Sequence, residues 1–516
     1  MKLLNRFKNL IIDKNETEVH TKLYKNIKEN MKVSRHILKN QEYLKQVFNK
    51  SNDIIYKTLT LENNNLKLLV VGINGLMDAQ VITDDIFVPL KEQDRFKDTE
   101  KLTLSTIKRN LLTALEVELS NDFNKLINSL FLGETILFIE GYEEALIVGT
   151  HGWKERNIES PQTEETIRGS RESFVESVGT NITLIRRRIK TPDLAIEQLK
   201  VGRKTQTEIR LIYISGVCNS NIVNEVRERI ENIDTDGVVG SAQVEQLIEC
   251  NKWTVFPQTL ATERVDRVIG SILEGRLAIM VDGTPFILIT PITFTSFLNS
   301  PDDYYERSVT SSFMRLIRYI SYFLTTTLPA LYLALTAYHP GMIPTPLVLT
   351  ITESRIGLPF PTIIEVFIME FTLEILTEAS IRLPRPIGQT VSIVGGLVIG
   401  QAAVQAGIVS PLIIIIVALT ALTSFVIPIY TFTLSNRMIR FPLILVAGAL
   451  GLYGIFMGWL FLLIHLASLE CFGVRYLSDF SPYSLNSLKD TFIKVPQSLM
   501  KKRPEILNVE DIKRQN

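Results

Sequence analysis

Residues 270–291 read GSILEGRLAIMVDGTPFILITP, and residues 128–149 read NSLFLGETILFIEGYEEALIVG. At an offset of 142 residues Ser129 matches Ser271, Gly133 matches Gly275 and Gly141 matches Gly283. In each, two apolar runs flank a glycine-containing turn, a pattern typical of a β-hairpin. Self-similarity at a fixed offset predicts that one structural unit occurs twice.

The repeat extends beyond the hairpin on its N-terminal side. The elements expected in the first copy are strands at Lys67–Gly72, Thr135–Glu140 and Ala145–Gly149 and a helix at Leu104–Ser120; those expected in the second are strands at Ile209–Ile214, Leu277–Asp282 and Phe286–Thr290 and a helix at Ile222–Asn232. Strands that alternate with helices predict an α/β fold. We therefore expect two duplicated α/β subdomains, residues 61–169 and 201–300.

A charged connector, residues 170–200, joins the two subdomains and contains Arg186, Arg187 and Arg188. Paired α/β lobes often bind a small molecule in the cleft between them. A docking and assembly platform is the alternative, and no convergent catalytic group is visible in either copy. Residues 1–60 hold 13 Lys or Arg against 6 Asp or Glu. They are expected to form a basic, partly disordered arm that either touches anionic lipid or is simply solvated.

Charge content divides the rest of the chain. No lysine occurs between Lys252 and Lys489, and Tyr304–Glu470 holds 7 Glu, 8 Arg and no Asp in 167 residues. Uncharged apolar runs at Tyr319–His339, Leu412–Leu434 and Phe441–Leu469 each reach the roughly 20 residues that a membrane helix needs. We expect residues 301–470 to form an all-α polytopic membrane domain, followed by a basic C-terminal tail, 471–516.

A fourth uncharged run, Gly388–Gly407, is rich in small residues. Ser392, Gly396 and Gly400 recur at four-residue spacing, which places a small-residue strip on one helix face. Such strips allow close helix packing within lipid, although a flexible glycine-rich span without a partner is the alternative.

Arginine pairs at the span ends leave the topology open. The pairs are Arg315 and Arg318, Arg382 and Arg385, and Arg437 and Arg440. If the helix containing Glu365 to Glu378 crosses the membrane, five spans place all three pairs on the side of the N-terminal domain, as the positive-inside rule prefers, and the C-terminus outside. If that helix does not cross, four spans remain and the lysine-bearing tail lies inside.

Four acids interrupt this otherwise apolar helix: Glu365, Glu370, Glu374 and Glu378. At 100° per residue the last three share one face and Glu365 points away from them. Acids at membrane depth are costly and usually face protein or water. They are candidates for an ion pathway or gate in an oligomer. Pairing with Arg355, Arg382 or Arg385, or a solvated interfacial face, is the alternative.

Other chemistry is not indicated. Cys218, Cys250 and Cys471 lack metal-ligand spacing and are an odd number, so they are expected to be ordinary thiols in a reducing compartment. The five histidines show no metal pattern, and neither a phosphate-binding loop nor a nucleophile constellation occurs. With 55 basic and 55 acidic residues the chain is not a polyanion binder overall. We therefore expect no enzyme, cofactor, metal or nucleic-acid partner.

Four motifs carry a family resemblance. They are NITLIRRRIKTPDL from Asn181, TERVDRVIGSILEGRLAIMVDGTPFILITP from Thr262, DDYYER from Asp302 and RLPRPIGQTVSIVGGLVIGQAAVQAGIVSP from Arg382. In this order they resemble the A subunit of GerA-type spore germinant receptors over residues 60 to 485. Val265 departs from the family, which usually has proline there, and this changes a local turn without affecting the assignment.

The resemblance implies a multi-pass protein of the spore inner membrane with its N-terminal domain facing the core. It also implies a transporter-like B subunit and a C-subunit lipoprotein as partners, contact with membrane lipid, and a homo-oligomeric ion channel that releases monovalent cations when nutrient is sensed. A non-conducting signalling scaffold, a nutrient sensor in the cleft between the lobes and a paralogous sporulation protein that amplifies germination are the alternatives.

Overall fold

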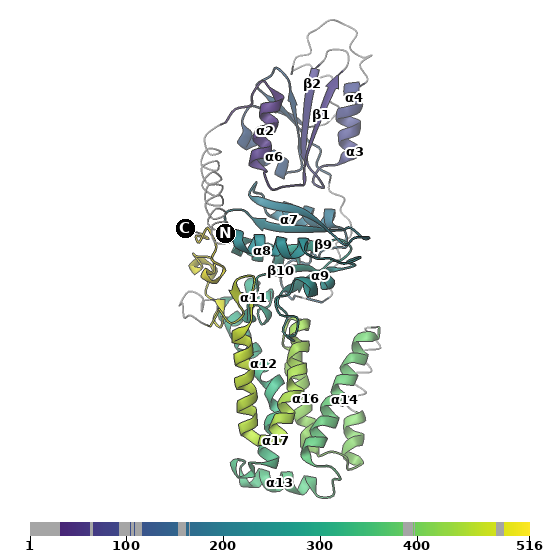
Figure 1. The fold of residues 1–516 in the computed structure, drawn as a ribbon, viewed down its shortest axis with the longest axis vertical. Coiled ribbons are helices and arrows are strands. Elements are labelled where there is room, and N and C mark those ends of the chain that lie inside the picture. The colour runs from purple at the N-terminus through teal and green to yellow at the C-terminus, as the bar shows by residue number, and fades with distance from the viewer. Residues whose placement is uncertain are drawn as a thin grey trace, which may run out of the picture.

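The computed structural model describes residues 31–61, 66–91, 104, 108, 116–152, 161, 163–164, 166–384, 396, 398–480 and 490–515 of the 516. Along the long axis the first α/β subdomain is followed by the second and then by a region of helices (Figure 1).

Two antiparallel five-stranded sheets form the N-terminal half, with strand orders β1-β2-β4-β5-β3 and β6-β7-β9-β10-β8. The first contains β1 (Ile54–Leu61), β2 (Leu66–Ile73), β3 (Val117–Ser120), β4 (Thr135–Ile139) and β5 (Ala145–Val148). The second contains β6 (Leu194–Val201), β7 (Thr207–Ile214), β8 (Leu260–Thr262), β9 (Leu277–Val281) and β10 (Ile287–Thr290). The predicted pair of α/β subdomains is confirmed, because the second sheet repeats the first strand for strand.

Helices cover both faces of each sheet. On the first sheet, α2 (Ile37–Val47) and α6 (Phe123–Phe131) cover one face, and α3 (Ala79–Ile82), the π-helix η1 (Thr83–Phe87) and α4 (Val88–Lys91) lie on the other side. On the second, α7 (Val178–Arg188) and α10 (Val265–Glu274) cover one face and α8 (Ser220–Glu231) and α9 (Ser241–Ile248) the other. Successive strand residues point to opposite faces, so Leu211 packs under α8 and α9 whereas Ile212 packs under α7 and α10.

A buried asparagine begins each copy in the same way. The Asn40 side chain accepts a hydrogen bond from the backbone N–H of Ser34 and donates one to the Ser34 carbonyl, each at 2.8 Å. Asn181 makes the same two bonds with Val175, at 2.8 and 2.6 Å. The repeat therefore includes the helix that carries this asparagine.

Both subdomains begin earlier than the sequence predicted. Helix α2 and strand β1 belong to the first subdomain, although all of their residues except Leu61 lie in the expected arm, residues 1–60. Helix α7 and strand β6 belong to the second, although all of their residues except Val201 lie in the expected connector, residues 170–200. Polar residues on the solvent-facing sides hid the short apolar stripes, such as Ile37 and Leu44 of α2. The predicted helix at Leu104–Ser120 is also corrected, because its last four residues form β3 and pair with β5.

The helical region begins with α11 (Asp302–Tyr305) and α12 (Ser308–Ala337). It continues with the short η5 (Pro340–Met342), α13 (Thr345–Arg355), α14 (Thr362–Arg382), α16 (Pro411–Phe425) and α17 (Tyr430–Ser468). Helices α12 and α17 are long and apolar enough to cross a membrane. Helix α13 lies crosswise at the end far from the sheets (Figure 1).

Helix α17 folds back on itself at Gly451, whose φ of 63° and ψ of −139° are not helical. Gly458 lies directly against the side chain of Leu443. Fifteen residues of a straight helix span about 22 Å, so this contact requires two antiparallel arms, 430–450 and 452–468. A left-handed φ at the turn suits glycine, which has no Cβ.

The predicted apolar runs are divided differently in the structure. Tyr319–His339 corresponds to α12, but Leu412–Leu434 is shared between α16 and α17, with Pro428 in the break between them. Phe441–Leu469 contains the Gly451 turn and therefore contributes to both arms of α17. Residues 388–395 and 397 of the run Gly388–Gly407 lie outside the described residues, and residues 398–405 are helical.

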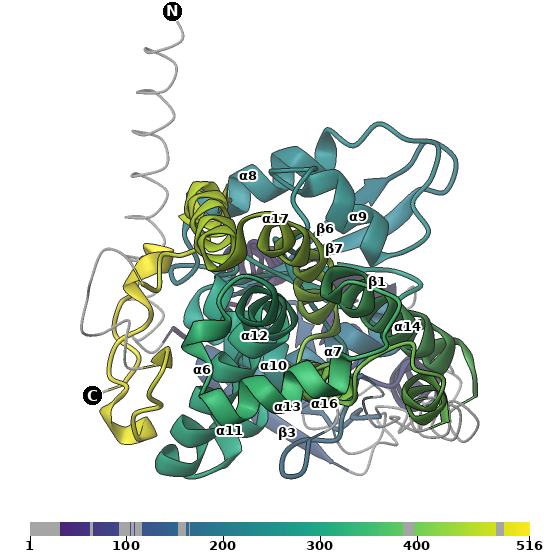
Figure 2. The same cartoon turned by 90° about the horizontal axis from the view of Figure 1, so that it is seen from below.

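The C-terminal tail returns to the second α/β subdomain. Just after α17 it forms a small hairpin, β11 (Glu470–Cys471) and β12 (Val474–Arg475), and further on the short 3₁₀ helices η7 (Gln497–Leu499) and η8 (Glu505–Leu507). Asn219 Nδ2 donates to the Asn508 carbonyl at 3.2 Å, and Arg503 Nε donates to the Leu273 carbonyl at 2.9 Å. Figure 1 shows the tail at the level of the second subdomain, and seen from below it runs along one side of the molecule (Figure 2). Both ends of the helical region therefore join the same side.

Replacing Gly451 by alanine should destabilise the helical region. The new methyl carbon would lie 3.0 Å from His339 Nε2 and from Tyr338 Cβ, on a backbone that disfavours L side chains. We expect a loss of about 1–3 kcal/mol, measured by thermal unfolding in detergent. Gly396→Ala is the matched control, because that glycine is helical and no described atom lies within 4 Å of the added methyl. Equal effects of both substitutions would contradict the hairpin.

Candidate functional site

Helix α14 carries the four acids that the sequence singled out, and each lies beside an arginine. The ion pairs are Glu365–Arg355 at 3.2 Å, Glu370–Arg440 at 3.0 Å, Glu374–Arg437 at 2.6 Å and Glu378–Arg382 at 2.6 Å. The face that carries Glu370 and Glu374 meets the first arm of α17, whereas Glu365 is bound elsewhere. The contacts correspond to the pairing alternative, and a role of these acids in an ion pathway stays a prediction.

Burial of these acids decreases along α14. Glu365 and Glu370 are completely buried, whereas the Glu378 side chain is 53% exposed. Arg440, the partner of Glu370, is also buried. Removing one partner of a buried pair leaves an uncompensated charge, while an exposed pair on one helix contributes little. The Glu370–Arg440 pair is therefore the energetically sensitive contact between α14 and α17.

Two of the four arginine partners were not anticipated. Arg355 and Arg382 were among the partners considered from sequence, and Arg385 lies outside the described residues. Arg437 and Arg440 come from α17, far along the chain from α14. The sequence predicts only that these two arginines lie at the end of a span. The antiparallel packing that brings them to α14 has no local sequence signal.

Glu365 joins three segments at the far end of the helical region. Besides Arg355, which ends α13, it accepts a hydrogen bond at 3.3 Å from the backbone N–H of Ser410, the residue before α16. A buried carboxylate with several donors is well stabilised. This contact fixes α13, α14 and α16 relative to one another.

The small-residue strip is only partly observed. Ser392 lies outside the described residues. A methyl group at Gly400 would lie 3.6 Å from Ile414 of α16, an ordinary packing distance, and one at Gly396 would meet no described atom within 4 Å. Gly400 thus lies at a helix contact. A packing role for the whole strip remains a prediction.

Arg186 lies where the two α/β subdomains meet. Its completely buried guanidinium donates to both carboxylate oxygens of Asp53, at 2.7 and 3.0 Å, to the Ser51 hydroxyl and to the Leu194 carbonyl. Bidentate pairs of this kind are strong and geometrically specific. Arg188, in contrast, makes a half-exposed pair with Glu172. Arg186, one of the three arginines that the sequence singled out, therefore links the two subdomains.

A second buried cluster connects the tail to α12. Asp303 binds Arg315 at 3.0 Å and Arg318 at 2.8 Å, and Asp490 of the tail binds Arg315 at 2.9 Å. Lys494 donates to the Asp303 carbonyl. Burial lowers the pKa of Lys494. The tail, α11 and α12 therefore share one charge network, and Arg318 Nη1 also donates to the Leu298 carbonyl of the second subdomain at 3.2 Å.

A cavity of about 920 Å³ lies between the second subdomain and the tail, not in the cleft between the two lobes. Its lining includes Arg276, Asp479 and Arg503. Burial raises the pKa of Asp479, which accepts a hydrogen bond from Thr295. The expectation of a ligand in the cleft between the lobes gains no support from this cavity.

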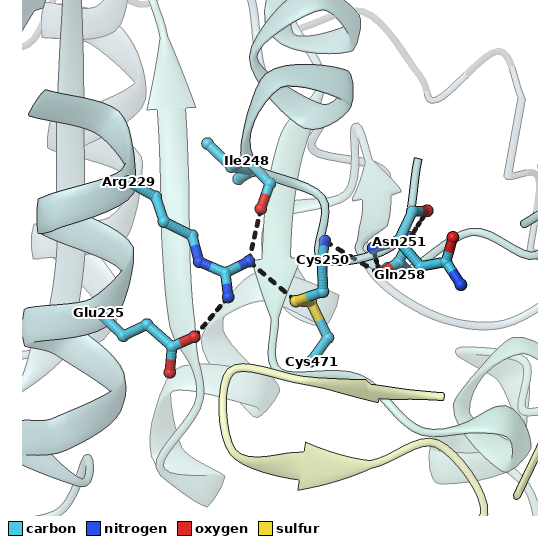
Figure 3. Close-up of a disulfide and its surroundings, with 7 residues drawn as sticks. All are labelled: Glu225, Arg229, Ile248, Cys250, Asn251, Gln258 and Cys471. Carbon is cyan, nitrogen blue, oxygen red and sulfur yellow. Dashed lines mark hydrogen bonds and ion pairs between the residues drawn. A yellow bond between two sulfur atoms is a disulfide. The ribbon is translucent and has the colours of Figure 1, made fainter. Parts of the chain in front are cut away.

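Cys250 and Cys471 form a disulfide, which corrects the expectation of free thiols (Figure 3). The two residues are 221 positions apart, so their pairing could not be seen from spacing. Arg229 Nη1 lies 2.8 Å from Cys250 Sγ and also donates to the Ile248 carbonyl, while its Nη2 donates to Glu225. The disulfide attaches the end of α17 to the second subdomain.

These features define a class of protein: two fused α/β subdomains fastened through the C-terminal tail to a region of apolar helices. Among the described residues no group of His, Cys, Asp and Glu side chains is arranged to hold a metal ion. The contacts described above hold helices and subdomains together.

The chain belongs to the GerA family, because residues 42–506 match the model of the Bacillus/Clostridium GerA spore germination proteins. It is 42% identical to spore germination protein KA of Bacillus subtilis over 94% of this chain and 89% of that protein. It is 38% identical to spore germination protein GerLA of Bacillus cereus over 89% of this chain and 93% of that protein. The resemblance to A subunits of germinant receptors is thereby confirmed.

A solved structure also matches. It is the crystal structure of the N-terminal domain of the A subunit of the Bacillus megaterium spore germinant receptor GerK3, which is 36% identical. The match covers 51% of this chain and 98% of that one, with a TM-score of 0.41.

Replacing Asp53 by asparagine should weaken the joint between the subdomains, because it leaves the Arg186 charge buried without a counter-charge. We expect a loss of about 3–5 kcal/mol, measured by denaturant unfolding of the full chain in detergent. Glu172→Gln, at the half-exposed Arg188 pair, is the control and should cost about 0–1 kcal/mol. An Asp53→Asn variant whose free energy of unfolding is unchanged would contradict the role of Arg186.

The disulfide should be found by mass spectrometry of peptides from unreduced protein, as a linked pair containing Cys250 and Cys471. Cys471→Ser should lower stability by about 2–4 kcal/mol because it opens a long covalent loop. Cys218→Ser is the control: that thiol is buried, with its pKa raised by burial to about 12, and it takes no part in the disulfide. Recovery of Cys250 and Cys471 as unlinked peptides alone would refute the pairing.

Proposed function

We propose that this germinant-receptor A subunit is a multi-pass protein of the spore inner membrane, with its α/β subdomains and C-terminal tail on the core side. Supporting this, five arginines lie toward the end of the helical region that joins the α/β half: Arg315, Arg318, Arg382, Arg437 and Arg440. Arg355 lies at the opposite end. This asymmetry follows the positive-inside rule.

Six helical passes account for the chain between the two attachments to the second subdomain. They are α12, α14, the segment that contains the helical residues 398–405, α16 and the two arms of α17. Six passes keep both termini on one side, and they let the acidic helix α14 cross as well. With four spans α14 does not cross the membrane, and with five spans the C-terminus lies outside. Neither alternative includes the turn at Gly451, which has no sequence signal.

The receptor function that we propose is the gating of a monovalent-cation pathway through an oligomer of this chain. The observation that carries it is the buried Glu370–Arg440 pair, which holds α14 against the first arm of α17. Separation of the two helices would release acids at membrane depth, where carboxylates attract cations and lower the barrier to their passage. The paired arrangement thus represents the closed state.

The signal would enter through the α/β half. The network around Asp303 and Arg315 joins the tail to α12, and Arg318 of α12 donates to the Leu298 carbonyl of the second subdomain. Helix α12 is hydrogen-bonded to both arms of α17, because Thr326 donates to Asn436 of the first arm and Thr327 accepts from Trp459 of the second. A transporter-like B subunit and a C-subunit lipoprotein are the proposed partners. The exposed apolar side chains of α17, such as Phe456 and Phe461, would face lipid or neighbouring subunits.

A non-conducting scaffold that relays nutrient binding is the second candidate. The observation that favours it is that all four acids of α14 are paired with arginines, so none is free to line a pathway in this arrangement. A scaffold would use the same ion pairs only to hold its helices.

Cation release from vesicles that contain the purified chain distinguishes the two. Glu370→Gln should raise release in the absence of nutrient about tenfold or more, since roughly 1.4 kcal/mol lost from the closed state already changes the open fraction tenfold. Glu378→Gln, at the exposed pair on the same helix, should leave release unchanged. Absence of release from every variant, with the proteins folded, would contradict gating and favour the scaffold.

A further inference from the structure

One tryptophan projects fully from the junction between the second subdomain and the helices. Trp253 is 96% exposed, and its neighbour Lys252 is exposed as well. Lys252 is also the last lysine before the long lysine-free stretch of the sequence. Single exposed apolar residues are common on protein surfaces, so exposure alone does not indicate a binding surface. The position of Trp253 in the fold is the informative feature.

The loop that presents Trp253 is held firmly to the second subdomain. Gln258 Oε1 accepts hydrogen bonds from the backbone N–H groups of Cys250 and Asn251, at 3.1 and 3.0 Å, and Gln258 Nε2 donates to the Asn251 carbonyl at 2.7 Å (Figure 3). The Asn251 side chain accepts from the Trp253 N–H at 3.0 Å. The exposure of Trp253 is therefore built into an ordered turn.

The same loop is fastened to both arms of α17. Thr254 Oγ1 lies 2.9 Å from His465 Nε2 on the second arm, and the Ser435 hydroxyl on the first arm donates to the Val255 carbonyl. Phe256 is buried and packs near Phe432. These contacts place the loop within two turns of the ends of α17 that meet the second subdomain.

The outward apolar surface of α17 begins at this level. Near Ser435 the exposed apolar side chains are Tyr430, Leu434 and Met438, and near His465 they are Phe461, Leu463 and Ile464. If these side chains meet lipid, the boundary between hydrocarbon and water lies close to the loop. Trp253 then stands where an aromatic ring with one N–H is favoured and where a lysine reaches phosphate.

The geometry points to Trp253, assisted by Lys252, as an anchor in the lipid headgroup layer that sets the height of the second subdomain above the bilayer. This inference rests on the proposed membrane location. The partner is the polar headgroup region of the bilayer itself, because the loop is already bonded to α17 and the indole extends beyond those bonds.

Fluorescence quenching by brominated phospholipids tests the anchor in the full chain reconstituted into vesicles. The chain has three tryptophans. Trp153→Phe with Trp459→Phe leaves Trp253 as the reporter, and Trp153→Phe with Trp253→Phe leaves Trp459. Trp459 donates a hydrogen bond to Thr327 of α12 inside the helical region and therefore reports membrane depth. Leu132→Trp in a chain without the natural tryptophans is the control, since Leu132 is half-exposed in the distant first subdomain.

We expect lipid brominated near the headgroup to quench Trp253 fluorescence at least about twice as strongly as lipid brominated near the end of its acyl chain. Trp459 should show the opposite preference, and the residue 132 reporter should respond only to aqueous iodide. Quenching of Trp253 by iodide alone would overturn the anchor, and so would protection from both quenchers, which would show that protein covers it. Quenching of Trp459 by aqueous iodide and not by any brominated lipid would contradict the membrane location itself.

Discussion

The return of the chain to the second subdomain directly after α17 is the constraint on which the rest of the structure depends. Cys471 is bonded to Cys250, and the next residue, Phe472, is buried in the subdomain core with the Arg229 guanidinium 4.7 Å from its ring. Phe472 adopts a left-handed φ of 52°, unusual for a bulky side chain, and its buried ring and the neighbouring disulfide hold it there. Since α12 also leaves from this subdomain, the helices between must run out and come back.

Charge pairing follows from this folded-back arrangement. The first arm of α17 runs antiparallel to α14, which brings Arg437 and Arg440 beside Glu374 and Glu370. In an apolar setting such charges are stable only in pairs. The same antiparallel packing that returns the chain therefore also creates the most sensitive contact between helices, and any motion of one helix changes the environment of the other's charges.

The sequence predicted features that have a local or repeated signal. The glycine and serine matches at offset 142 indicated the duplicated subdomains, and lysine depletion marked the helical region. Features whose sequence signal is diluted or non-local were not predicted. Helix α2 is amphipathic within a basic stretch, the Gly451 turn sits inside a continuous apolar run, and the Cys250–Cys471 pair spans two regions. The acids on α14 were found from sequence, but their partners on α17 depend on tertiary packing.

The most direct test of this folded-back arrangement is to measure on which side of the membrane the C-terminal tail lies. A cysteine is introduced at Gln515, at Lys200 of β6 or at Thr350 of α13, each on a Cys218→Ser background, and all three positions are exposed. Sealed vesicles containing the full chain are then treated with a membrane-impermeant thiol reagent. The account predicts that Gln515→Cys and Lys200→Cys react in the same fraction of molecules and that Thr350→Cys reacts in the complementary fraction. Reaction of Gln515→Cys together with Thr350→Cys would contradict it.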